Sequence, residues 1–175
     1  EYIRHQVHQY YLLRVKKRIQ VGDYENAVLF VMQALNVDRA SYEAHYLNGI
    51  ILAGLGDVAG AVKSASFAVE LAPENAALRT GYFYILLQAD RLSDAVEQLE
   101  AILRFDPANE FALRNMGLYY AEKENDFASA LAFFERLYSV APGDSESVGL
   151  LAWGYFQSGN KSEARRIVKE GGRYY

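Results

Sequence analysis

The stretch NGIILAGLGDVAGAVKSASFAVELAP, residues 48–73, carries the pattern that decides the fold. An apolar segment containing a small residue, Gly49, ends at the turn Gly56-Asp57, and a second apolar segment ends before Pro73. Glycine at a turn, aspartate at a helix start and proline after a helix end are the signals that delimit neighbouring helices. This stretch therefore predicts a helix–turn–helix unit.

The same unit recurs along the whole chain. One alanine early in each second helix returns at intervals of 34, 34, 35 and 34 residues, and we call these five the ladder alanines: Ala27, Ala61, Ala95, Ala130 and Ala164. A proline follows twelve residues after three of them, at Pro73, Pro107 and Pro142. A fixed period of this length is the signature of a repeat solenoid.

Applying the pattern to every period predicts ten helices. First helices are expected near 6–20, 42–54, 76–88, 110–122 and 145–157, and second helices near 24–37, 58–71, 92–104, 126–140 and 161–171. Aspartate is a favoured residue at a helix N-cap. The recurring aspartates at the turns are therefore expected to cap the helices that follow them rather than to form a catalytic pair: Asp23, Asp57, Asp90 and Asp126.

Two stretches together resemble a known family. Residues 48–73 match it most closely, and RNMGLYYAEKENDFASALAFFERLYSVAP, residues 114–142, matches with one extra turn residue near Asn125. The chain resembles a tetratricopeptide repeat protein, whose unit is a helix–turn–helix of 34 residues. The resemblance implies an all-α, right-handed superhelical solenoid that forms a single domain over 1–175. Its five repeats are expected at approximately 8–41, 42–75, 76–109, 110–144 and 145–175.

Composition narrows the classes of function. The chain has no cysteine, which excludes disulfides, thiolate catalysis and cysteine-bound zinc. Its net charge of −4 argues against a nucleic-acid partner. No catalytic trio, phosphate loop or dinucleotide motif is present, so we expect a non-enzyme without a cofactor. His5 and His8 share a helix face but lack a third ligand, so no metal site is expected.

The compartment stays open between the cytoplasm and a periplasmic or organelle-associated location. No apolar run is long enough to span a membrane. No signal peptide is visible, and membrane association is expected only through a partner. The last helix is unusually charged, which fits either a polar outer face that covers the end of the solenoid or a C-terminal segment that lies beyond the sequence.

In this family the first helices line the concave surface, and the resemblance assigns twelve residues to a partner-binding groove. They are Leu12, Lys16, Tyr46, Ile50, Tyr84, Leu87, Phe111, Arg114, Asn115, Leu118, Trp153 and Phe156. The family's basic clamp for a C-terminal carboxylate is absent, because Leu12, Leu47 and Gly81 stand at its places. The lining suits a helical or extended apolar segment instead.

Three functions remain open. The first is a protein-interaction scaffold or adaptor that binds a protein or peptide segment in the groove. The second is a self-assembling homo-oligomer, in which the basic residues Arg14, Lys17 and Arg18 dock on a neighbouring copy. Bacterial proteins of this kind, from pilus assembly and from magnetosomes, resemble the chain in repeat number and size. The third is an accessory region of a larger enzyme.

Overall fold

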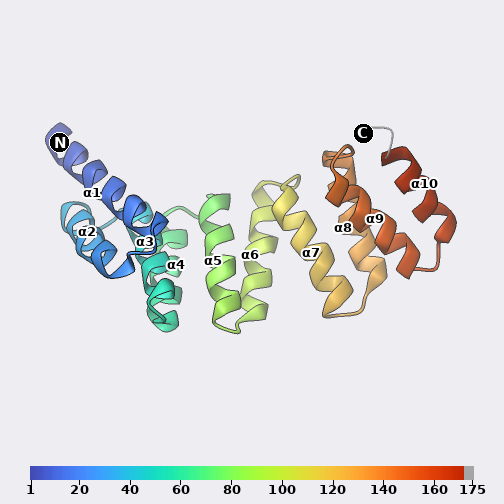
Figure 1. Ribbon diagram of the computed structural model, residues 1–175, viewed down its shortest axis with the longest axis horizontal. Coiled ribbons are helices and arrows are strands. Elements are labelled where there is room, and N and C mark those ends of the chain that lie inside the picture. The colour runs from blue at the N-terminus through green and yellow to red at the C-terminus, as the bar shows by residue number, and fades with distance from the viewer. Residues whose placement is uncertain (172–175) are drawn as a thin grey trace. The chain divides into compact units, whose positions relative to one another are not determined.

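The computed structural model describes residues 1–171, which form ten helices and no strand (Figure 1). The chain divides into two compact units. Unit 1 comprises Glu1–Gln98 and unit 2 comprises Leu99–Tyr175, so the boundary between them lies within a helix. The predicted all-α class is confirmed.

Unit 1 contains α1 (Tyr2–Gln20), α2 (Tyr24–Val37), α3 (Tyr42–Gly54), α4 (Val58–Leu71) and α5 (Ala76–Gln88). Helix α6 (Leu92–Phe105) crosses the unit boundary, and unit 2 continues with α7 (Glu110–Glu122), α8 (Phe127–Val140), α9 (Ser145–Gln157) and α10 (Lys161–Gly171). Nine of the ten predicted ranges agree with these bounds to within one residue. The exception is α1, which begins at Tyr2 rather than near residue 6.

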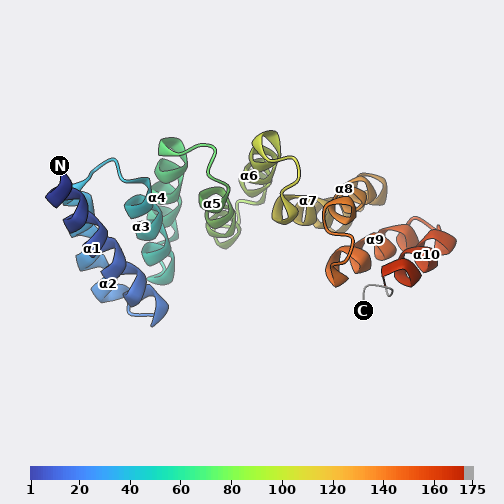
Figure 2. The same ribbon diagram turned by 90° about the horizontal axis from the view of Figure 1, so that it is seen from above.

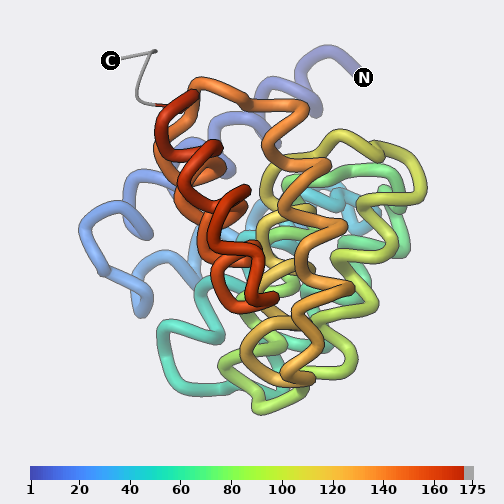
Figure 3. The backbone as a smooth tube through the Cα atoms, turned by 90° about the vertical axis from the view of Figure 1, so that its right-hand side faces the viewer, coloured from blue at the N-terminus to red at the C-terminus, as the bar shows by residue number. Residues whose placement is uncertain are grey.

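Consecutive helices pack as pairs within each unit. In unit 1, α1 packs against α2 and α3 against α4, and α5 packs on both α3 and α4. In unit 2, α7 packs against α8, α9 against α8, and α10 against α9 (Figures 2 and 3). Each new first helix therefore lies against the pair that precedes it within its unit, as stacking of repeats requires.

The ladder alanines are buried between packed helices. Four of them have no solvent exposure, and Ala164 is 8% exposed. A Cβ atom added to Gly49 of α3 would lie 3.3 Å from the carbonyl oxygen of Ala61 in α4. Such a distance is at the limit of van der Waals contact, so Gly49 has no room for a larger side chain. The predicted role of small residues in close helix packing is confirmed for Gly49 and Ala61 in the second repeat.

Each unit has its own apolar core. The core of unit 1 joins α1, α2 and α3 through Leu12, Val15, Ala27, Val31, Ala34, Ala44, Leu47 and Ile51. The core of unit 2 joins α7 to α10 through Ala121, Ala130, Phe134, Val148, Leu151, Ala152 and Ile167. Phe134 is fully buried, and its ring occupies the space that a side chain at Gly117 would need.

The turn inside each pair has one repeated geometry. A residue with positive φ stands at five equivalent places, Gly22, Gly56, Asp90, Asn125 and Gly159. In four turns the amide of the next residue donates to the carbonyl five residues earlier, as from Asp57 to Leu52. In the α7–α8 turn Asp126 reaches Tyr120, six residues earlier. This wider turn holds the extra residue predicted near Asn125.

Three of the four expected aspartate caps are confirmed. The carboxylates of Asp23, Asp57 and Asp126 accept hydrogen bonds from the amides of Asn26, Gly60 and Ser129. Hydrogen bonds from the Ser129 side chain and amide also hold the pKa of Asp126 below its usual value.

The expectation for Asp90 is wrong. Its φ is 55°, so this residue forms the left-handed turn, and Arg91 directly precedes α6. Asp90 therefore takes the place that glycine has in three other turns. Aspartate tolerates the left-handed region better than most residues other than glycine.

We expect Gly117→Ala to destabilise unit 2, because the added methyl group overlaps the ring of Phe134 in a closed core. Overpacking of this kind costs about 1–3 kcal/mol. Urea denaturation followed by circular dichroism measures the change. The matched control is Gly149→Ala in α9, where no atom lies within 4 Å of the added Cβ. The control should gain about 0.5–1 kcal/mol from helix propensity, and equal destabilisation of both variants would contradict the packing argument.

Candidate functional site

Two of the predicted groove residues in unit 1 serve packing. Leu12 is 1% exposed and lies inside the core, so it is a core residue rather than a surface residue. Ile50 is half-buried and packs against the same core. The sequence pattern places both on first helices but does not show which side of each helix its neighbours cover.

Tyr46 of α3 is held between helices. A Cβ atom at Gly81 of α5 would overlap the Tyr46 hydroxyl, so the glycine leaves the space that the ring fills. Burial raises the pKa of Tyr46 above its usual value, because the charged phenolate loses solvation. Tyr46 therefore links α3 to α5 and offers only part of its surface to a partner.

Other residues of unit 1 do reach solvent. Tyr84 is 57% exposed and Leu87 is 37% exposed, both on α5. The ring of Tyr84 meets that of Phe83 edge to face at 5.4 Å, which orients it. Lys16 is exposed, and its Nζ lies 2.6 Å from Oε1 of Glu43. Tyr84 and Leu87 are the apolar surface that α5 presents.

In unit 2 the polar candidates on α7 have partners within the fold. Nε of Arg114 lies 2.9 Å from Oε2 of Glu146 in α9, an ion pair whose angle falls outside hydrogen-bond geometry. The side-chain Nδ2 of Asn115 donates to the backbone carbonyl of Phe111 one turn earlier, at 2.7 Å. Phe111 and Leu118 are half-buried. These residues stabilise α7 and its contact with α9.

The aromatic candidates on α9 differ from each other. Trp153 is half-buried and packs against Phe127 and Phe134, with ring centroids 5.7 and 6.0 Å away. Phe156 is 54% exposed, and the ammonium of Lys161 lies 5.7 Å from its ring centroid. Trp153 therefore belongs partly to the core, whereas Phe156 lies on the surface.

The basic residues of α1 are partly engaged within unit 1. The guanidinium of Arg14 lies 5.0 Å from the ring centroid of Phe30, and Arg18 forms a 2.7 Å ion pair with Asp23. Lys17 is exposed. Of the three predicted self-association residues, Lys17 is thus the one without such a contact among the described residues.

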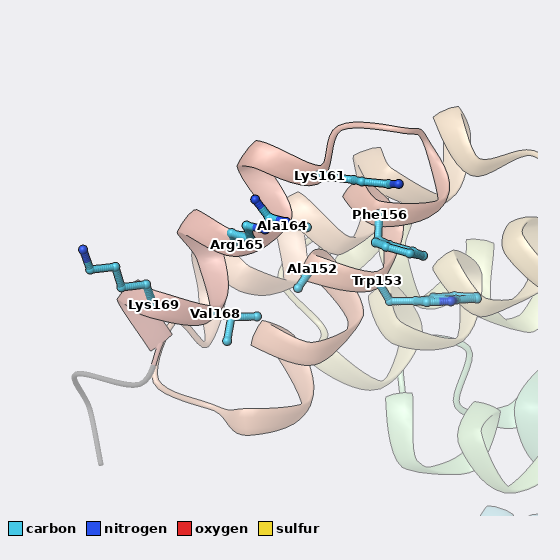
Figure 4. Close-up of a pocket in the computed structure, with 8 residues that line it drawn as sticks. All are labelled: Ala152, Trp153, Phe156, Lys161, Ala164, Arg165, Val168 and Lys169. Atoms are coloured by element: carbon cyan, nitrogen blue, oxygen red, sulfur yellow. The ribbon is translucent and has the colours of Figure 1, made fainter.

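An open pocket of about 570 Å³ lies between helices α9 and α10 in unit 2 (Figure 4). Its wall on α9 is formed by Ala152, Trp153 and Phe156, and its wall on α10 by Lys161, Ala164, Arg165, Val168 and Lys169. The volume lies within the range of known ligand pockets. The sequence does not assign the α10 residues to a site, because a charged last helix fits a polar outer face or a further C-terminal segment as well as a pocket wall.

Two of the three histidines, His8 and His45, have structural roles. His8 is buried, and its two ring nitrogens lie 3.1 Å from the Ala34 carbonyl and 2.9 Å from Ser41 Oγ. His45 Nε2 lies 2.9 Å from the Arg39 carbonyl, and the His45 ring meets Phe67 edge to face.

Among residues 1–171, no cluster of metal-ligating side chains is present. No helix in the described part of the chain has the length and apolarity needed to cross a membrane.

Comparison with known proteins identifies the repeat. A family model described as "Tetratricopeptide repeat" matches residues 52–115 and 121–175. Comparison with curated proteins gives no match.

Three solved structures are similar in fold. The MamA protein has a TM-score of 0.76 at 19% identity, covering 97% of this chain and 92% of that one. Pseudomonas aeruginosa PilF has a TM-score of 0.77 at 18% identity, covering 98% and 78%. YrrB, described as "a TPR protein with an unusual peptide-binding site", has a TM-score of 0.68 at 19% identity, covering 94% and 84%.

A double-mutant cycle tests the position of Tyr46. In the Tyr46→Ala background, Gly81→Ala should stabilise the protein by about 0.5–1 kcal/mol, because only helix propensity changes. In the wild type the overlap with the Tyr46 hydroxyl should cancel or reverse that gain. We expect a coupling free energy of about 1 kcal/mol from urea denaturation. Additive effects would show that the ring does not lie on Gly81.

Proposed function

Because this chain belongs to the tetratricopeptide repeat family, we propose that it is a non-catalytic scaffold that binds a helical or extended apolar segment of another protein. The supporting observation is that large apolar side chains on first helices remain exposed in both units. Examples are Tyr84 and Leu87 in unit 1 and Phe156 in unit 2. Apolar and aromatic side chains of this kind are the usual anchors of protein interfaces.

The chemistry of these surfaces favours a peptide over a small polar ligand. Tyrosine combines a large apolar face with a hydroxyl that can exchange hydrogen bonds with a peptide backbone. The pocket beside Phe156 adds a recess that can accept a side chain. The peptide-binding site named for YrrB, a protein of similar fold, supports the same class of ligand.

Loss of the exposed surface on α5 should weaken partner capture without unfolding the protein. We expect Tyr84→Ala combined with Leu87→Ala to reduce capture of a specific partner by about tenfold or more, because interface anchors dominate binding energy. Affinity capture with quantitative mass spectrometry gives the measurement. The control is Leu29→Ala combined with Met32→Ala on α2, two exposed apolar residues of a second helix. A partner lost equally from both variants, or from neither, would argue against this surface.

Self-association through α1 is a second candidate, favoured by one observation. Five large apolar side chains of α1 are exposed, namely Tyr2 at 77%, Ile3 at 76%, Val7 at 38%, Tyr10 at 53% and Leu13 at 52%. They lie on a helix whose other side packs into the core of unit 1 through Leu12 and Val15. An exposed apolar stripe on one helix suits docking against a second copy.

Surface substitutions test this candidate better than removal of α1, because deletion of residues 1–20 would open the core. We expect Ile3→Asp combined with Leu13→Asp to convert any oligomer to monomer in light scattering, since each charge would be desolvated at an interface. Circular dichroism should be unchanged because both residues are exposed. Oligomers that persist in the variant would rule out α1 as the contact.

A further inference from the structure

The ladder alanines allow the last helix pair to be compared with the earlier ones, position by position. Three residues before each ladder alanine stand Tyr24, Val58, Leu92, Phe127 and, in α10, Lys161. One residue after each ladder alanine stand Val28, Val62, Val96, Leu131 and, in α10, Arg165. Both positions are apolar in the first four repeats and cationic in the fifth.

These two positions receive the next first helix in the earlier repeats. Tyr24 of α2 lies against Gly54 of α3, where an added Cβ would be 2.6 Å from the ring. Phe127 of α8 meets Trp153 of α9 edge to face at 5.7 Å. Leu131 of α8 lies against Gly154 of α9, 3.1 Å from a Cβ placed there. The groove between the two helices of a pair is therefore shaped for a helix.

In α10 the same positions face the pocket described above (Figure 4). Lys161, Arg165 and Lys169 follow one another at intervals of four residues, which places them along one side of the helix. Among the described residues, none of the three is paired with a carboxylate. Arg166, by contrast, is paired with Glu163 at 2.6 Å and with Glu170 at 2.9 Å. The cations that border the pocket are therefore available to pair with carboxylates of a partner.

A polar end face that only meets water is the alternative explanation, because terminal repeats commonly have one. Such a face would not retain large apolar side chains, yet Phe156 is 54% exposed and Val168 is 57% exposed beside the cations. Apolar walls with a cationic rim are complementary to an apolar side chain flanked by carboxylates. The combination fits a bound segment better than bulk solvent.

We propose that the α9/α10 groove binds an acidic amphipathic helix of a partner protein. Carboxylates of that helix pair with Lys161 and Arg165, and a bulky apolar side chain enters the pocket against Phe156 and Val168. The inference rests on the proposed scaffold function and specifies the chemistry of the segment that is bound. The apolar contact supplies most of the affinity, and the exposed ion pairs select acidic partners.

A phage-displayed library of amphipathic helical peptides, with apolar residues fixed on one face and all other positions random, tests the proposal. Selection on the wild-type chain should enrich aspartate and glutamate among the random positions. A selected peptide, labelled with fluorescein, should bind Lys161→Glu combined with Arg165→Glu about tenfold more weakly or worse in fluorescence anisotropy. Binding to the wild type should weaken as salt rises.

The matched control is Lys63→Glu combined with Lys123→Glu, which changes the net charge equally at two exposed residues that do not line the pocket. Its affinity for the peptide should stay at the wild-type value. Phe156→Ala should also weaken binding, because the apolar wall is lost. Circular dichroism on each variant verifies that the helices are intact.

Several outcomes would overturn the proposal. They are a selection that yields no binder, binders without acidic enrichment, and peptides that bind the Lys161/Arg165 variant as well as the wild type. Oligomers of the wild type that dissociate in this variant would assign the groove to a second copy, and binding that appears only after deletion of residues 172–175 would assign it to the chain itself. Partner capture that depends on Tyr84 but not on Lys161 and Arg165 would leave the scaffold function standing.

Discussion

Close packing of two helices around each buried ladder alanine is the constraint on which the rest of the structure depends. In the second repeat, Gly49 leaves space against the backbone of Ala61, so the helix axes come near enough for the surrounding apolar residues to meet. In the fourth, Gly117 instead leaves space for the ring of Phe134. Where one helix has a glycine, the facing helix therefore has either a small residue that lets the backbones approach or a large ring that fills the space. Both solutions fill the interior, as close packing demands.

The turns inside the helix pairs keep the two helices of each pair at this close spacing. A left-handed residue and its neighbours reverse the chain in three or four residues, and the geometry is kept where Asp90 or Asn125 replaces glycine. The α7–α8 turn absorbs its extra residue because the Asp126 amide bonds to the carbonyl of Tyr120, six rather than five residues earlier, so the ladder continues at Ala130 and Ala164. Loops tolerate insertions because their ends, rather than their length, are fixed by packing.

Several large apolar residues are not needed to fill the cores, and these are the candidates for binding a partner. Tyr84, Leu87 and Phe156 are exposed although each unit has a buried core, and Tyr46 and Trp153 share their rings between packing and surface. The last pair then departs from the ladder at Lys161 and Arg165, where four repeats have apolar residues. The α9/α10 groove has the shape of the earlier grooves but a positive charge. It is therefore suited to an acidic segment, whereas each earlier groove accepts the next helix of the chain.

By itself, the sequence determined the repeat, the helix ends and the inserted residue. These features depend on local signals such as glycine turns, aspartate caps and the period of the alanines, which act over a few residues. Only the tertiary structure decided which face of each helix is covered. Leu12 and Leu87 both stand on first helices, yet one is buried and the other is exposed, because their environment depends on neighbours distant in the chain. The pocket bordered by Lys161, Arg165 and Lys169 could not be predicted for the same reason. The sequence of a charged helix is the same whether its charged side chains face open solvent or a groove.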